Sequence, residues 1–207
     1  MDDSTGFSGI SPTTLADLLG REQVMDIGIR PLWASAGRVA GPAFTVRCAP
    51  GDNLMLHAAI HRAEPGSVIV VEAGDLDYAV AGGNVCAVAR RRGIAAFVVD
   101  GVIRDLAEVR AMGFPVFARG VIPVPGVKAV VEPLNGPVRC GGVTVNAGDV
   151  VVADEEGVVV VPAARQAQLL ADARAKQAKE EAESLDAWEE AHRAKIDGIL
   201  AENGFTG

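Results

Sequence analysis

Apolar runs alternate with polar, helix-forming segments over the first 120 residues. The runs SVIVVEAG (67–74), IAAFVVDG (94–101) and FPVFARG (114–120) are rich in β-branched or aromatic residues, which predicts three buried strands. Between them, GGNVCAVARRRG (82–93) and RDLAEVRAMG (104–113) end in glycine after helical spacing, which predicts two helices. This alternation of strand and helix predicts an α/β sheet with parallel strand pairs.

Three more elements precede this alternation. SPTTLADLLG (11–20) predicts a helix, because Ser is a cap, Pro suits the first helical position and Gly stops the helix. RVAGPAFTVRCAPG (38–51) predicts an extended segment interrupted by Gly-Pro. DNLMLHAAIHRAEPG (52–66) predicts a helix that begins at an Asp or Asn cap and ends at Pro-Gly.

The pattern changes after residue 120. Residues 127–162 are rich in valine and punctuated by NG, GG, AGD and EEG, which predicts a strand-rich and mostly antiparallel region. Residues 162–200 predict a long helix of Ala, Glu, Lys and Arg, with a break near Ser184. Because the apolar stripe of this helix is thin, we expect it to pack on a neighbouring subunit.

Composition and charge narrow the class of protein. About half of the 207 residues are apolar, enough for one well-buried domain, and no run approaches the roughly 20 residues that cross a bilayer. The acidic N-terminus lacks the features of a signal peptide, so we expect a cytoplasmic protein with no membrane partner. The net charge of −8 argues against nucleic acid as a partner. The arginine triplet at 90–92 is expected at a solvated helix end.

The cysteines and histidines suggest little metal chemistry. Cys48, Cys86 and Cys140 have no CxxC spacing, so we expect buried thiols. His57 and His61 share one helix face, with Glu64 three residues later, and such a face can bind zinc. The segment lacks the glutamate of HExxH, however, which favours capping or packing roles for both histidines.

Two loops are expected to meet at one edge of the sheet. Gly82, Gly83 and Asn84 open a helix, where free backbone amides bind carboxylate or phosphate oxygens; a plain glycine turn is the alternative. The stretch VVDGVIRD (98–105) leaves the next strand and carries an arginine between acidic residues. Arginine grips carboxylates and Asp suits a hard cation such as Mg²⁺, whereas the alternative is a structural ion pair that caps the next helix.

Lysine usage bears on the type of chemistry. Lys128, Lys176, Lys179 and Lys195 are the only lysines, and none lies on these two loops. A Schiff base with a keto substrate would therefore require Lys128 to fold back, so a metal acting as Lewis acid is the favoured electrophile. No GxSxG, P-loop or GxGxxG motif indicates a hydrolase, kinase or dehydrogenase.

Four blocks resemble the 4-hydroxy-4-methyl-2-oxoglutarate aldolase family, also called the regulator-of-ribonuclease-activity A-like (RraA-like) family. They are PGDNLMLHAAIHRAEPGSVIVVEAG (50–74), GGNVCAVARRRGIAAFVVDGVIRD (82–105), GFPVFARG (113–120) and AGDVVVADEEGVVVVP (147–162). The resemblance implies an α/β fold, an αββα sandwich of the swivelling β/β/α type, in homotrimers or homohexamers. It implies an RraA-like domain over 1–162 and a C-terminal helical extension over 163–207.

The resemblance also implies a class II pyruvate aldolase that depends on Mg²⁺ or Mn²⁺. Such enzymes cleave 4-hydroxy-4-methyl-2-oxoglutarate or 4-carboxy-4-hydroxy-2-oxoadipate to pyruvate and an oxo acid, and they decarboxylate oxaloacetate. By resemblance, Asp105 is the metal ligand and Arg104 holds the keto acid. The segment Gly82–Val85 binds substrate, with the amides of Asn84 and Val85 receiving the pyruvyl carboxylate.

One position departs from the family pattern. The signature is an aspartate, twenty intervening residues and then Arg-Asp, and this chain has Gly83 at the position of that aspartate. Asn84, Asp75 or Asp77 are candidates to compensate. The family also draws a glutamate from a neighbouring subunit, and four candidates lie near the C-terminus: Glu180, Glu181, Glu189 and Glu190. The alternative function is that of relatives without the Arg-Asp pair, which bind and inhibit a ribonuclease.

Overall fold

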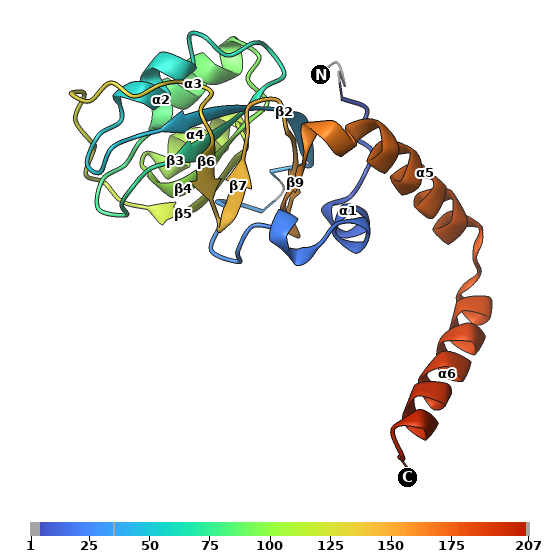
Figure 1. The fold of residues 1–207 in the computed structure, drawn as a ribbon. Coiled ribbons are helices and arrows are strands. Elements are labelled where there is room, and N and C mark those ends of the chain that lie inside the picture. The colour runs from blue at the N-terminus through green and yellow to red at the C-terminus, as the bar shows by residue number, and fades with distance from the viewer. Residues whose placement is uncertain (1–4, 35, 206–207) are drawn as a thin grey trace.

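A seven-stranded mixed sheet forms the centre of the molecule (Figure 1). The computed structural model describes residues 5–34 and 36–205. Strands β2 to β5 run parallel to one another, whereas β1, β8 and β9 pair antiparallel at the two sides. In order across the sheet, the strands are β1 (Arg30–Pro31), β5 (Val116–Val121), β4 (Ala96–Ile103), β3 (Val68–Glu72), β2 (Val39–Arg47), β8 (Val150–Asp154) and β9 (Gly157–Val161).

Helices cover one face of this sheet. Alternate strand residues such as Ile69 and Val71 face α2, α3 and α4, while Val68 and Val70 face the other side. Helices α1 and α5 pack on β8 and β9. The helices are α1 (Pro12–Leu18), α2 (Leu54–Ala59), α3 (Gly83–Arg91), α4 (Leu106–Met112), α5 (Gln166–Ala182) and α6 (Leu185–Glu202), with 3₁₀ turns η1 (Arg21–Gln23) and η2 (Ala163–Arg165).

A two-stranded ribbon covers the opposite face. Strands β6 (Val138–Cys140) and β7 (Val143–Val145) pair antiparallel and bury Val138, Cys140, Val143 and Val145 against the sheet. The predicted α/β class with parallel pairs is therefore confirmed, with helices, main sheet and β-ribbon as successive layers. No helix among the described residues is long and apolar enough to span a membrane.

Three predicted elements differ from the structure. Strand β4 continues past Asp100 and Gly101 to Ile103, because the segment at Ala79 pairs with Val102 and prolongs the ladder. Residues 127–137 form no strand, since the buried carboxylate of Asp52 binds amides of this segment in place of a neighbouring strand. Helix α2 ends at Ala59, well before the Pro-Gly that was expected to stop it.

The C-terminal region divides into two unlike helices. The break predicted near Ser184 is confirmed, and the Ser184 hydroxyl accepts a hydrogen bond from the Ala187 amide. Helix α5 buries Leu169 and Ala173 against its own chain, while its expected packing on a neighbouring subunit stays a prediction. Helix α6 buries no residue and extends away from the body (Figure 1).

The cysteines and the arginine triplet lie as predicted. Cys48, Cys86 and Cys140 are buried and unpaired. Burial raises the pKa of the Cys48 thiol to about 11, so this thiol stays protonated at neutral pH. Residues 90–92 are exposed at the end of α3, where cations suit the negative end of the helix dipole.

Candidate functional site

The two loops singled out in the sequence meet at the end of β4. The Val80 amide donates to Val102 O at 3.0 Å, and the Arg104 amide donates to Ala81 O at 2.9 Å. This pairing brings Gly82 beside the Arg-Asp pair. A Cβ at Gly82 would lie 2.4 Å from Asp105 Oδ2, so a side chain here would force the Asp105 carboxylate to shift.

Asp105 has an unusual backbone conformation. Its φ of 59° and ψ of 37° place it in the left-handed region, directly before α4. Its Oδ2 accepts a hydrogen bond from the Gly83 amide at 3.0 Å and lies 3.6 Å from Arg104 Nε. A non-glycine residue in this region is uncommon and often marks a functional position. The strain points the Asp105 carboxylate toward the start of α3.

The start of α3 offers an anion site. The amides of Asn84 and Val85 have no hydrogen-bond acceptor among the residues described. They occupy the positive end of a nine-residue helix that has no side-chain cap. Arg104 stands beside them, with its side chain about two-fifths exposed. A carboxylate placed here meets free N–H groups and a guanidinium together.

These groups line one pocket of about 220 Å³. Five of the residues predicted from sequence line it: Gly82, Asn84, Val85, Arg104 and Asp105. Gly83 is not a lining residue, but its amide donates a hydrogen bond to Asp105 Oδ2. The other lining residues were not assigned to the site from sequence: Asn53, His57, Ala79, Ala81, Pro125 and Lys128.

Lys128 reaches the pocket because its loop is tied to the start of α2. Asp52, which is 3% exposed, accepts the amides of Ala129 at 2.6 Å and Val130 at 3.0 Å. Asn53 donates from Nδ2 to Gly126 O at 3.0 Å. The loop is thereby held on both sides of Lys128. A folded-back Lys128 was the exception considered in the sequence, and the structure shows that arrangement.

Asn53 leaves one buried atom without a partner. The residue is 3% exposed, and the bond from Nδ2 to Gly126 O fixes the orientation of the amide. Its Oδ1 is the one buried side-chain atom in the described part of the chain that lacks a hydrogen bond. Such an atom is costly unless a donor arrives, so the pocket is suited to a ligand with a hydroxyl or bound water.

His57 lines the pocket as a neutral imidazole. Burial, followed by the charge of Lys128, lowers its pKa to about 4. The zinc interpretation finds no support, since residues 5–34 and 36–205 contain no group of three or more His, Cys, Asp or Glu positioned for a metal. His61 and Glu64 lie outside the pocket wall. The sequence did not place His57 in this pocket, because the other lining residues, such as Arg104 and Lys128, come from distant segments.

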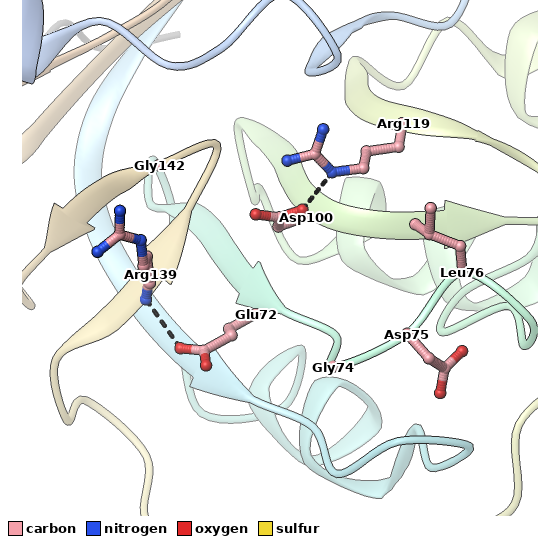
Figure 2. Close-up of a pocket in the computed structure, with 8 residues that line it drawn as sticks. All are labelled: Glu72, Gly74, Asp75, Leu76, Asp100, Arg119, Arg139 and Gly142. Carbon is pink, nitrogen blue, oxygen red and sulfur yellow. Dashed lines mark hydrogen bonds and ion pairs between the residues drawn. The ribbon is translucent and has the colours of Figure 1, made fainter.

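A larger cavity of about 430 Å³ lies on the ribbon face of the sheet (Figure 2). Here Asp100 accepts from Arg119 and from the Gly141 amide at 2.8 Å, and Arg119 also binds both oxygens of Asp26 at 3.0 and 2.8 Å. Glu72 accepts the Arg139 amide at 2.8 Å. These charges are paired with one another and hold the ribbon to the sheet. Asp100 is therefore a structural acceptor.

Neither Asp75 nor Asp77 replaces the acid expected at position 83. Asp75 lines the larger cavity, and its oxygens accept the amides of Gly51, Asp77 and Tyr78. Asp77 does not line the smaller pocket either. The expectation that one of them reaches the Arg-Asp pair is wrong for Asp75, because the turn at 75–78 uses its carboxylate.

The donor set of the smaller pocket fits a hard cation that keeps most of its water. Asp105 supplies one carboxylate, with its side chain about one-third exposed, and Asn53 Oδ1 is an oxygen in need of a donor. Mg²⁺ and Mn²⁺ accept such oxygen-rich, partly hydrated sites, whereas zinc prefers several nitrogen or sulfur ligands.

Comparison with known proteins identifies the family of this chain. Residues 12–160 match the family profile described as RraA-like, Aldolase/RraA. A Halalkalibacterium halodurans protein, provisionally named 4-hydroxy-4-methyl-2-oxoglutarate aldolase, is 41% identical over 206 residues, covering 99% of this chain and 94% of its own.

Two solved structures share the fold and part of the sequence. Streptomyces coelicolor RraAS2, described as an unusual member of the RNase ES inhibitor RraA family, superposes with a TM-score of 0.77 at 32% identity, over 85% of this chain and 92% of its own. The RNA-processing inhibitor RraA from Thermus thermophilis gives 0.66 at 29% identity, over 72% and 91%.

Proposed function

The chain belongs to the RraA-like family, and from this premise we propose that it is a cytoplasmic, divalent-metal-dependent pyruvate aldolase. Its substrates are 4-hydroxy-4-methyl-2-oxoglutarate or 4-carboxy-4-hydroxy-2-oxoadipate, and it also decarboxylates oxaloacetate. The observation that carries the proposal is one pocket that combines Arg104, the strained Asp105 and the free amides of α3.

The pyruvyl half of the substrate belongs at α3. Its carboxylate suits the free amides of Asn84 and Val85, and its 2-oxo group suits the guanidinium of Arg104. When the C3–C4 bond breaks, its electron pair becomes the enolate of pyruvate. Arg104 stabilises the negative charge where it develops, which is the largest single contribution in many such reactions.

Asp105 is the residue that would hold Mg²⁺ or Mn²⁺. When bound, the cation supplies Lewis-acid polarisation of the 2-oxo group. The Gly83 amide on Oδ2 fixes the rotation of the Asp105 carboxylate. Asp105 is thus oriented before any ligand binds, which reduces the cost of ordering the site.

The other half of the substrate faces Asn53, His57 and Lys128. Lys128 offers a positive charge to the second carboxylate, and its ammonium has no hydrogen-bond partner in the described chain. Asn53 Oδ1, which lacks a donor, would accept a hydrogen bond from the 4-hydroxyl group. In cleavage this hydroxyl loses its proton and becomes the carbonyl of the second product, while C3 of the enolate gains a proton.

The position of Lys128 favours a second mechanism for the same reaction. A lysine in the pocket can form a Schiff base with the 2-oxo group. Borohydride reduction in the presence of pyruvate separates the two mechanisms. The metal-dependent mechanism predicts no covalent adduct and full activity afterwards, whereas a Schiff base predicts an inactive protein with the added mass on Lys128.

The similarity to RNA-processing inhibitors supports a different candidate, a protein that binds and restrains a ribonuclease. The exposed valines at 121, 124, 127, 130 and 131 beside the pocket offer an apolar surface for such a contact. Recovery of a ribonuclease together with inactivity on every oxo acid would support it.

A screen of 4-hydroxy-2-oxo acids and oxaloacetate, with pyruvate as the readout, tests the proposed function. We expect pyruvate release with added Mg²⁺ or Mn²⁺ and its loss in EDTA. Activity that is unchanged by EDTA would contradict the metal role.

A further inference from the structure

The space beside Gly83 is filled by a carboxylate. A Cβ at Gly83 would lie 2.1 Å from Glu108 Oε2, and its three nearest heavy atoms all belong to the Glu108 side chain. At Gly82 the corresponding Cβ would meet Asp105 Oδ2 at 2.4 Å. Two carboxylates therefore stand over two consecutive glycines, at the start of α3.

The Glu108 carboxylate has no structural task in this position. It has no hydrogen bond or ion pair within residues 5–34 and 36–205, and α4 shows no side-chain cap. Its backbone amide donates to Asp105 O at 3.0 Å. A glutamate that served the helix start would instead bond a free amide there. Its placement over Gly83 is thus unexplained by the stability of α4.

A separate observation marks the smaller pocket, which Asp105 lines and beside which the exposed Glu108 stands outside the lining, as a ligand site. Asn53, which lines the same pocket as Asp105, is buried, and its Oδ1 lacks a hydrogen-bond donor. A bound species that donates hydrogen bonds would therefore suit this pocket. Water molecules around a cation at Asp105 are such donors, and carboxylates next to a metal site commonly orient them.

We propose that Glu108 is the second carboxylate of this site, acting as a positioning residue from α4 in place of a side chain at position 83. It accepts hydrogen bonds from the water shell of a cation held by Asp105, and Gly83 lacks a side chain because Glu108 occupies that space. The inference rests on the proposed metal-dependent function and adds a residue that the Arg-Asp pattern does not contain.

The test measures Mn²⁺ affinity of the full chain by titration calorimetry. Glu108→Gln keeps the shape and removes the charge, and we expect it to weaken Mn²⁺ binding by about 10-fold or more. Glu156→Gln removes the same charge from the β8–β9 turn, outside the pocket, and serves as the matched control.

A pair of compensating substitutions tests whether the carboxylate must occupy the space beside Gly83. Glu108→Ala weakens binding, and Gly83→Asp placed in that background returns a carboxylate to the same space, so we expect it to regain most of the lost affinity. Gly83 has no left-handed φ, so aspartate is tolerated by the backbone.

Three outcomes are decisive. Unchanged Mn²⁺ affinity in Glu108→Gln overturns the inference while leaving the metal-dependent function intact. A Gly83→Asp/Glu108→Ala protein that binds no more tightly than Glu108→Ala also overturns it. Wild-type protein that binds no Mn²⁺ overturns both the inference and the metal-dependent function.

Discussion

Asp105 shows, at the scale of a single residue, how function and stability oppose each other. Its left-handed backbone disfavours any residue with a Cβ, by roughly 1–2 kcal/mol for an alanine-like side chain. We therefore predict that Asp105→Gly is more stable to unfolding than Asp105→Ala by about 1 kcal/mol, although both lose the carboxylate. Chemical denaturation measures the difference, and equal stabilities would show that the backbone is not strained.

His57 gives the protein a pH dependence in mildly acidic solution. Its pKa is about 4 in the folded protein and 6.5 when unfolded, so between these values the unfolded chain binds more protons. Stability should therefore fall as pH decreases from 6.5 to 4, and His57→Gln should flatten this part of the profile. The pKa of Asp26 and of Asp52 is also lowered, but from an ordinary value of 3.8, so their contribution to stability is lost only at lower pH. Parallel profiles for wild type and His57→Gln would contradict the assignment.

The loop of Lys128 and the start of α2 act together as one structural unit. Asp52 holds the amides of Leu54, Ala129 and Val130, so Asp52→Asn should destabilise the fold by about 1–3 kcal/mol. It should also raise KM, because Lys128 loses its anchor. Lys128→Met should raise KM without a change in stability. Thermal unfolding and steady-state kinetics of both variants measure this, and an Asp52→Asn protein with normal KM would mean that the loop is placed by other contacts.

The elements that the sequence predicted well are those specified by local patterns. The strands at 67–74 and 94–101, the helix at 82–93 and the break at Ser184 follow from apolar runs, glycine stops and a serine cap. These local patterns also predicted that Arg104 and Asp105 lie near the start of α3, because parallel strands end at one edge of a sheet. The structure has these residues in one pocket.

The elements that the sequence missed depend on contacts between distant segments. Residues 127–137 look like a strand, yet their amides bind Asp52, about 75 residues earlier in the chain. The contacts between this segment and the start of α2 also place Asn53 and Lys128 in the pocket. The spacing of apolar residues along the sequence gives no sign of these contacts. The space over Gly83 likewise depends on Glu108, which only the folded chain brings there.

At the scale of the whole molecule, α6 stands out because it has no buried residue within the described part of the chain. Leu185, Trp188, Ile196 and Ile199 form an exposed apolar stripe on a helix that buries nothing. We expect it to pack on a second copy of the chain, which also carries Glu189 and Glu190 toward a neighbour. Trp188→Asp/Ile196→Asp should therefore reduce the oligomer mass in light scattering, with circular dichroism unchanged. An unaltered mass would assign assembly to another surface.

The central claim is that the smaller pocket at Arg104 and Asp105, not the larger cavity on the ribbon face, is the active site. The most direct test compares Asp105→Asn with Asp100→Asn in Mg²⁺-dependent pyruvate release. Asp105→Asn should lower kcat/KM by about 100-fold or more, since it removes the charge that would hold the cation. Asp100→Asn should mainly lower stability, because it weakens the pairing with Arg119. Full activity in Asp105→Asn, with activity lost in a folded Asp100→Asn protein, would contradict the account.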